Sequence, residues 1–147
     1  MENNVIISIQ GRQSYEQAEE ETIELVTEGC LQPDGAEGYT LSYQESELTG
    51  LEGTLTTFQI ERDRVTLLRM GEVNSQMVFE EGRRHLSMYN TPYGALAVGI
   101  STKKMKAELD AAGGSIEIDY AIEIDHAVAA ENLFRIQVRH KALHIKQ

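Results

Sequence analysis

An alternating run near the C-terminal end constrains the fold more than any other part of the chain. Between Ser115 and Asp125, isoleucine or tyrosine mostly occupies the even positions, and glutamate or aspartate most of the odd ones. Successive side chains of an extended chain point to opposite faces, so this segment has one apolar and one acidic face. That pattern is typical of a strand in an antiparallel sheet that covers a single core.

Strand-like runs with short turn signals between them follow one another along the whole chain. The turn signals include Pro33-Asp34-Gly35 and Gly113-Gly114, because proline, aspartate and glycine suit the backbone angles of a reversal. About ten strands are expected on this basis: Val5 to Arg12, Thr22 to Leu31, Tyr39 to Glu45, Gly53 to Glu61, Val65 to Gly71, Ser75 to Glu80, Arg84 to Tyr89, Gly94 to Asp110, Ser115 to Asp125 and Leu133 to Leu143.

One segment, Thr102 to Ala112, fits two structures. Thr102 suits a helix N-cap, and glycines follow where a helix would end. The same residues also alternate between apolar and charged side chains, as in a strand. The apolar phase lies on even positions before Thr102 and on odd positions after it, so a strand here needs a β-bulge. We favour the bulged strand over the helix.

The large share of strand and the lack of a convincing crossover helix favour a closed barrel over an open sheet. We therefore expect an all-β fold, a single antiparallel up-and-down barrel of about ten strands that comprises residues 1–147 as one domain. Closure requires the last strand to pair with the first. That pairing would bring Arg135, Arg139 and Lys141 close to the acidic N-terminal strands.

Charge is distributed unevenly, which excludes some partners. The formal net charge is −11, and residues 1–52 hold twelve acidic residues but only one basic residue, Arg12. Such a surface repels phosphate backbones and anionic lipids, so neither a nucleic acid nor a membrane is expected as a partner, whereas a basic protein remains open. The single cysteine, Cys30, and the absence of a signal-like N-terminus indicate the cytoplasm.

Several short segments together resemble a known family, and the resemblance spans nearly the whole chain. The most specific of them is Tyr-x-Thr-x-Tyr-Gly, which runs from Tyr89 to Gly94. The chain is similar in this way to the YwiB-like family of uncharacterised bacterial proteins. The resemblance implies a calycin-like β-barrel, related in architecture to lipocalins, and a bacterial cytoplasm, but it implies no catalytic residue. The other matching segments are Tyr43-Gln44-Glu45, Gly53-Thr54 with Thr57, Arg69-Met70-Gly71, Met77-Val78-Phe79, Thr102, Gly113-Gly114 and Tyr120.

The barrel lumen is the expected place for a binding site, because a barrel of this strand number leaves a cavity. Glu45 shares a face with Tyr43, and Arg69 shares a face with Leu67, so both charged side chains are expected inside. There they would either pair with each other or await a polar ligand group, since a lone buried charge is costly.

Three further residues are candidates for ligand contacts. Tyr89 and Tyr93 could hold a ligand at the barrel mouth; alternatively, which we favour, Tyr89 is a core residue and Tyr93 covers the barrel end. His140 is in phase with Phe134 to Val138 and could face inward, either as a hydrogen-bonded core histidine or as a ligand contact. On a strand, His140 and His144 are about 13 Å apart, too far for one zinc ion. We therefore expect neither a metal nor a cofactor.

The sequence contains no nucleophile elbow, phosphate-binding loop or dinucleotide fingerprint. The leading hypothesis is non-catalytic binding of a small apolar or amphipathic molecule in the lumen. The first alternative is a protein-interaction module that uses the acidic N-terminal third. The second alternative is an enzyme that uses the lumen.

Overall fold

The computed structural model describes residues 3–15, 20–47, 51–71, 74–91, 94–124 and 127–141, and most of them lie in strands. The ten strands are β1 (Val5–Tyr15), β2 (Glu21–Asp34), β3 (Gly38–Gln44), β4 (Thr54–Ile60), β5 (Val65–Gly71), β6 (Ser75–Phe79), β7 (Arg84–Thr91), β8 (Gly94–Asp110), β9 (Gly113–Ile124) and β10 (Ala127–His140). Among these residues no helix is long and apolar enough to span a membrane.

The strands form one antiparallel sheet in the order β6-β5-β4-β3-β2-β1-β10-β9-β8-β7. The last strand pairs with the first over the length of β1, from Val5 opposite His140 to Tyr15 opposite Ala130. The predicted all-β barrel of ten antiparallel strands is therefore confirmed. The two ends of the sheet are β6 and β7, and the described residues form no backbone ladder between these two strands. The barrel is thus nearly closed, with a seam between two strands that follow one another directly in the chain.

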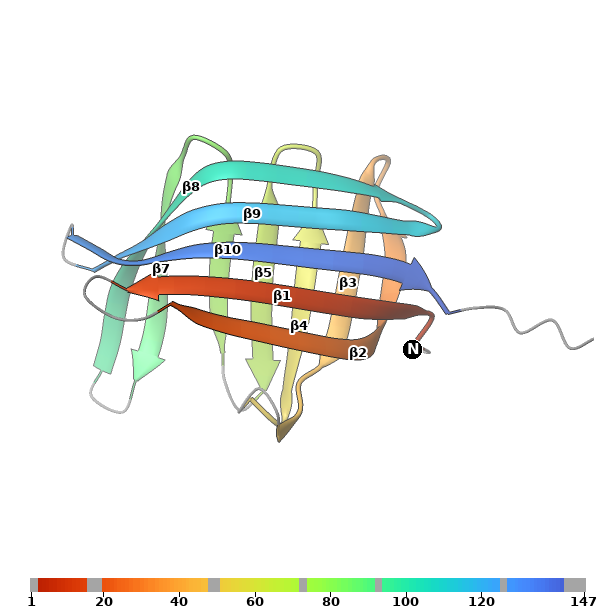
Figure 1. The fold of residues 1–147 in the computed structure, drawn as a ribbon, viewed down its shortest axis with the longest axis horizontal. Coiled ribbons are helices and arrows are strands. Elements are labelled where there is room, and N and C mark those ends of the chain that lie inside the picture. The colour runs from red at the N-terminus through yellow and green to blue at the C-terminus, as the bar shows by residue number, and fades with distance from the viewer. Residues whose placement is uncertain are drawn as a thin grey trace, which may run out of the picture.

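The barrel is flattened into two layers whose strands cross at a steep angle (Figure 1). Strands β1, β9 and β10 run across the front of the view, and β3 to β6 run steeply behind them. Strand β2 belongs to both layers, because residues 21–29 pair with β1 and residues 30–34 pair with β3. Gly29 lies at this change of partner, where a Cβ atom would come within 2.5 Å of the backbone carbonyl oxygen of Ser42. The close approach of the two layers at this corner therefore requires glycine.

Strand β8 turns the second corner and contains the predicted β-bulge. Thr102 lies opposite Tyr120, but the next pair is Lys104 with Asp119, so Lys103 is the extra residue. The bulge changes the inward phase, because Ile100 and Thr102 are buried before it and Met105 is half-buried after it. The segment is a bulged strand and not a helix, as the change of apolar phase in the sequence predicts.

The hydrophobic core lies between the two layers. Its members alternate along each strand, and the alternating β9 contributes Ile116 and Ile118, each 1% exposed. Burial of one such side chain stabilises the fold by about 2 kcal/mol. Edge-to-face ring contacts join the layers, with Phe58 of β4 6.1 Å from Phe134 of β10 between ring centroids. The apolar side chains whose alternation predicts the strands thus also fill the middle of the barrel.

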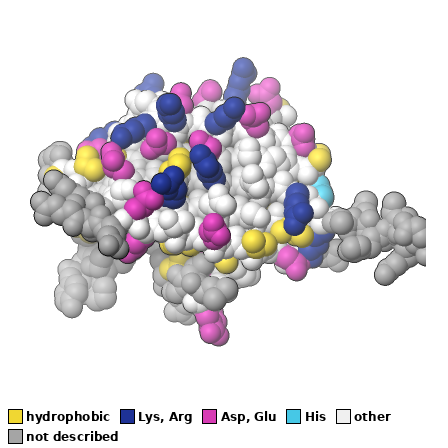
Figure 2. All heavy atoms as spheres, in the orientation of Figure 1, with side chains coloured by type: hydrophobic (Ala, Val, Ile, Leu, Met, Phe, Trp, Pro, Cys, Tyr) yellow, Lys and Arg dark blue, Asp and Glu magenta, His cyan; other side chains and the backbone are white. Residues whose placement is uncertain are grey.

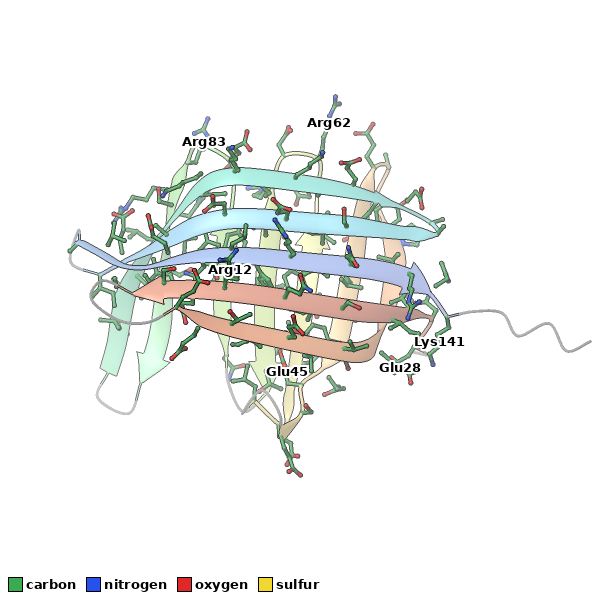
Figure 3. All side chains as sticks on the ribbon, viewed as in Figure 1. Arg12, Glu28, Glu45, Arg62, Arg83 and Lys141 are labelled. Carbon is green, nitrogen blue, oxygen red and sulfur yellow. The ribbon has the colours of Figure 1, made fainter. Side chains whose placement is uncertain are left out.

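The predicted charge complementarity at closure is only partly present. Lys141, directly after β10, forms an ion pair with Glu28 of β2, and both lie at the same end of the front layer (Figure 3). Arg135 instead pairs with Glu117 of the neighbouring strand β9 at 3.1 Å. Exposed pairs of this kind are worth at most about 1 kcal/mol each. Closure therefore depends mainly on backbone pairing and the core.

Candidate functional site

A cavity of about 390 Å³ lies between the two layers at the end of the barrel where β3 and β5 finish. This volume falls within the range of small-molecule sites, roughly 300 to 1,000 Å³. Both layers contribute to its wall, which is mostly apolar and carries a few polar groups. The lining residues are Ile9, Gly11, Arg12, Gln13, Glu21, Ile23, Leu25, Tyr43, Glu45, Leu51, Arg69, Tyr120, Asn132, Leu133 and Phe134.

The rear layer supplies a buried charged pair. Register places Tyr43 of β3 opposite Thr56 of β4, and Thr56 opposite Arg69 of β5, so the three side chains form a row across the inner face. Glu45 follows β3 with a side chain that is only 1% exposed, and its Oε2 lies 4.0 Å from Arg69 Nε. Thr56 Oγ1 donates a hydrogen bond to the same oxygen. The sequence-predicted pair is therefore inside the barrel and close together.

The charged pair perturbs the neighbouring phenol. Tyr43 is 6% exposed, and burial raises the pKa of its hydroxyl well above the ordinary value of 10.0. The negative charge of Glu45 raises this pKa further, whereas the positive charge of Arg69 lowers it. Tyr43 is consequently neutral near neutral pH and presents a hydroxyl, rather than a phenolate, to the cavity.

The front layer supplies a second polar row. Asn132 of β10 lies opposite Gln13 of β1 on one side and Tyr120 of β9 on the other. Asn132 is 8% exposed, and its Nδ2 has no hydrogen-bond partner among the described residues. Arg69 Nε is likewise buried without a hydrogen-bond partner in that part of the chain. Each layer thus contributes to the cavity wall one residue with a buried N–H donor that has no hydrogen-bond partner among the described residues.

The mouth of the cavity lies along β2. Among the described residues, β2 has no strand partner on its outer side from 21 to 29, so the layers separate there. Ile23 lies opposite Gly11 on the inward face, yet it is 59% exposed because the cavity opens at this point. Exposed apolar side chains appear along this lower edge of the front layer, whereas charged side chains of both signs cover its upper part (Figure 2).

The other sequence-predicted contacts do not join this cavity in the described residues. His140 lies on the inward face of β10, opposite Val5, but at the end of the strand. Its side chain is exposed, and its Nε2 donates a hydrogen bond to the carbonyl oxygen of Ala111. His140 is therefore an exposed residue at the strand end and not a buried core histidine, and eight residues of extended chain, about 26 Å, separate it from Asn132 in the cavity wall. For Tyr89 the structure describes the backbone only, which pairs with Leu96. Tyr93 is outside the described residues.

Sequence reasoning missed Asn132 and Gly11. Asn132 has the same parity as Phe134 and Ile136, so it is in phase with the core. The predicted last strand begins at Leu133, six residues after β10 itself begins, because those six residues contain several weak strand formers. Gly11 is in phase with Ile7 and Ile9, and its missing side chain helps to leave the cavity open. Continuation of the alternation before the predicted start of the last strand would have found Asn132, whereas Gly11 lies within the predicted strand Val5 to Arg12 and only its inward phase had to be noted.

The polar groups of the cavity wall include a compensated ion pair, a neutral phenol and an amide, held on strands or directly beside them. In the part of the chain that the structure describes, no group of three or more His, Cys, Asp or Glu side chains could hold a metal ion. On the acidic third, Glu20 pairs with Arg12 at 2.9 Å. Arg12 itself lies over β1 near the mouth (Figure 3). Protein interaction and lumenal catalysis both stay predictions.

Comparison with known proteins agrees with the fold. The chain is 27% identical over 105 residues to a Bacillus subtilis (strain 168) protein described as the uncharacterized beta-barrel protein YwiB, covering 71% of this chain and 72% of that protein. The crystal structure of the B. subtilis ywiB protein superposes with a TM-score of 0.83 at 21% identity and covers 95% of this chain and 93% of that one. A family model described as a domain of unknown function, DUF1934, matches residues 7–136, and the chain therefore belongs to this family.

Proposed function

We propose that the protein binds a small apolar or amphipathic molecule in the cavity between the two layers, without transforming it chemically. The observation that carries this proposal is the cavity of about 390 Å³, whose wall combines apolar side chains with one buried ion pair. Small-molecule sites typically have this composition, in which apolar surface supplies affinity and a few polar groups fix orientation.

The layout of the wall supports an amphipathic occupant. Ile9, Leu25 and Phe134 contribute apolar surface, while Glu45 and Arg69 place polar atoms on the rear layer. A molecule with an apolar body and one polar end would satisfy both parts of this wall. The mouth at β2 gives a route of entry that requires no strand to separate from its neighbour.

The proposal includes a cytoplasmic location. The chain has a single cysteine, Cys30, which cannot form an internal disulfide and is buried at the β2 corner. A buried thiol that contributes to a core is compatible with a reducing compartment.

Gly11 offers a direct test, because its position faces the cavity and a Cβ atom there would meet nothing within 4 Å. We expect Gly11→Phe to fill the cavity and to abolish binding of the neutral apolar dye N-phenylnaphthylamine, followed by its fluorescence. Thermal stability should not fall, since glycine within a strand is itself unfavourable by about 0.5 to 1 kcal/mol.

The matched control is Gln10→Phe, which adds the same ring one residue away on the exposed outer face of β1. This variant should bind the dye as the unsubstituted protein does. Equal dye binding by Gly11→Phe, or no dye binding by the unsubstituted protein, would remove the cavity as the proposed site.

A further inference from the structure

Three buried side-chain atoms have no hydrogen-bond partner among the described residues: Arg69 Nε, Thr102 Oγ1 and Asn132 Nδ2. Two of these residues, Arg69 and Asn132, line the cavity, and they approach it from opposite layers. A buried polar group without a partner is destabilising, so native structures keep few of them, and those that remain call for an explanation. In both of these lining residues the unpartnered atom is an N–H donor, so the missing partner must be an acceptor.

The charge balance of the cavity restricts the kind of acceptor. Arg69 is already matched by Glu45, whose carboxylate is almost fully buried 4.0 Å away. Arg12 at the mouth is matched by Glu20, and Glu21 adds a further negative charge to the lining. A ligand carboxylate would therefore place an additional, uncompensated negative charge beside Glu45. Burial of an unpaired charge is far more costly than burial of a neutral hydrogen-bonding group.

We infer that the cavity takes an uncharged amphipathic molecule whose carbonyl oxygen, as in an amide or an ester, accepts hydrogen bonds from Arg69 and Asn132. This inference rests on the proposed function and goes beyond it by naming the head group. The apolar body of the molecule lies against Ile9, Leu25 and Phe134, and its carbonyl end lies toward the polar rows.

Three probes with the same alkyl chain test the head group: octanamide, octanoate and octylammonium, each used to displace bound N-phenylnaphthylamine from the unsubstituted protein. Octanamide should displace the dye at a concentration about tenfold lower than either charged probe. Octanoate brings a second negative charge close to Glu45. Octylammonium can donate hydrogen bonds but cannot accept them.

A variant at Asn132 separates the contribution of the proposed hydrogen bond from that of shape complementarity. Asn132→Leu removes the N–H donor while keeping a side chain of similar size. It should lower the affinity for octanamide about fivefold to tenfold and leave dye binding unchanged. Retained dye binding shows that the variant is folded. Its matched control, Gln137→Leu, makes a like change at an exposed position of β10 and should leave octanamide affinity unaltered.

Each result has one meaning. The inferred head group is wrong if a charged probe displaces the dye as well as octanamide does, or if none of the three probes displaces it. It is also wrong if Asn132→Leu binds octanamide with unchanged affinity. In each of these cases the dye still binds, so the proposal of a binding cavity stands. If the dye itself does not bind, the proposed function fails first.

Discussion

The carboxylate of Glu45 is stable inside the barrel because several neighbours compensate it together. Thr56 donates a hydrogen bond to Oε2, and the guanidinium of Arg69 lies 4.0 Å from the same atom. Tyr43 is the third neighbour, and its pKa responds to both charges. Three of the four residues belong to the paired strands β3, β4 and β5, and Glu45, directly after β3, is held by a backbone hydrogen bond from its N–H to the carbonyl oxygen of Thr54.

Tyr43 gives this cluster a measurable pH dependence. Its folded-state pKa is raised above the unfolded value of 10.0, first by burial and then by Glu45. The folded protein therefore retains a proton that the unfolded chain releases, so stability is fully present below about pH 10 and is lost as the pH rises further. The slope approaches about 1.4 kcal/mol per pH unit.

We expect Tyr43→Phe to abolish this part of the alkaline loss of stability, because the variant has no phenol to ionise. Urea unfolding between about pH 8 and about pH 11 measures it. The two proteins should keep a constant difference in unfolding free energy up to about pH 10, after which the unsubstituted protein should lose stability faster. Parallel curves across the whole range would show that Tyr43 ionises normally and that the cluster is open to water.

Strand β8 shows how a local irregularity lets one strand serve both layers. Residues 94–101 pair with β7 and residues 99–110 with β9, and the bulge at Lys103 follows directly after the overlap. The extra residue bends the strand and changes the inward phase from Thr102 to Met105. Lys103 itself is exposed and pairs with Glu131 at 2.8 Å.

Deletion of one residue from β8 tests the bulge. Without Lys103 the strand alternates regularly, and Thr102 and Met105 both keep their inward positions. We expect this deletion to lower the midpoint of thermal unfolding by only about 5 °C.

Deletion of Lys106, another exposed lysine of β8, is the matched comparison. It moves either Ala107 and Leu109 or Met105 to the outer face, because a shift by one residue reverses the facing of a strand. The midpoint should fall by more than about 10 °C. An equal fall in the unfolding midpoint for the two deletions would mean that the strand tolerates loss of the bulge residue no better than loss of any other exposed residue.

Sequence patterns predict the strands wherever alternation is strong, as in β9, and they predict the bulge because parity changes within one continuous run. They fail where side chains carry little information. The first half of β10 contains three alanines, so its start, and with it Asn132, is not apparent. The turn at Glu81-Gly82 resembles a hairpin turn, and Gly82 has the expected positive φ of 76°. The seam beside it depends on how the whole sheet curls, which no local pattern encodes.

The arrangement of the two layers explains why the cavity lies at one end. Aromatic contacts between layers, Phe58 with Phe134 and Phe79 with Tyr120, fill the middle of the barrel. Gly11 of β1 lies directly opposite Phe134 and adds no side chain there, and the next inward pair is Gln13 with Asn132, which is too polar to continue the core. Glu45 lies at the lower end of the rear layer in Figure 3, while Arg62 and Arg83 mark the opposite end. Core packing thus stops short of the end where β3 and β5 finish.

The most direct measurement is native mass spectrometry of the protein purified gently from its own cells. It compares the unsubstituted protein, whose cavity is open, with Gly11→Phe, whose cavity is filled. The unsubstituted protein and the Gln10→Phe control should each carry a bound uncharged molecule of low mass, at one copy per chain, and Gly11→Phe should carry none. Should Gly11→Phe retain the same adduct, or should the unsubstituted protein be bare and fail to bind N-phenylnaphthylamine, the space between the two layers is not a binding site.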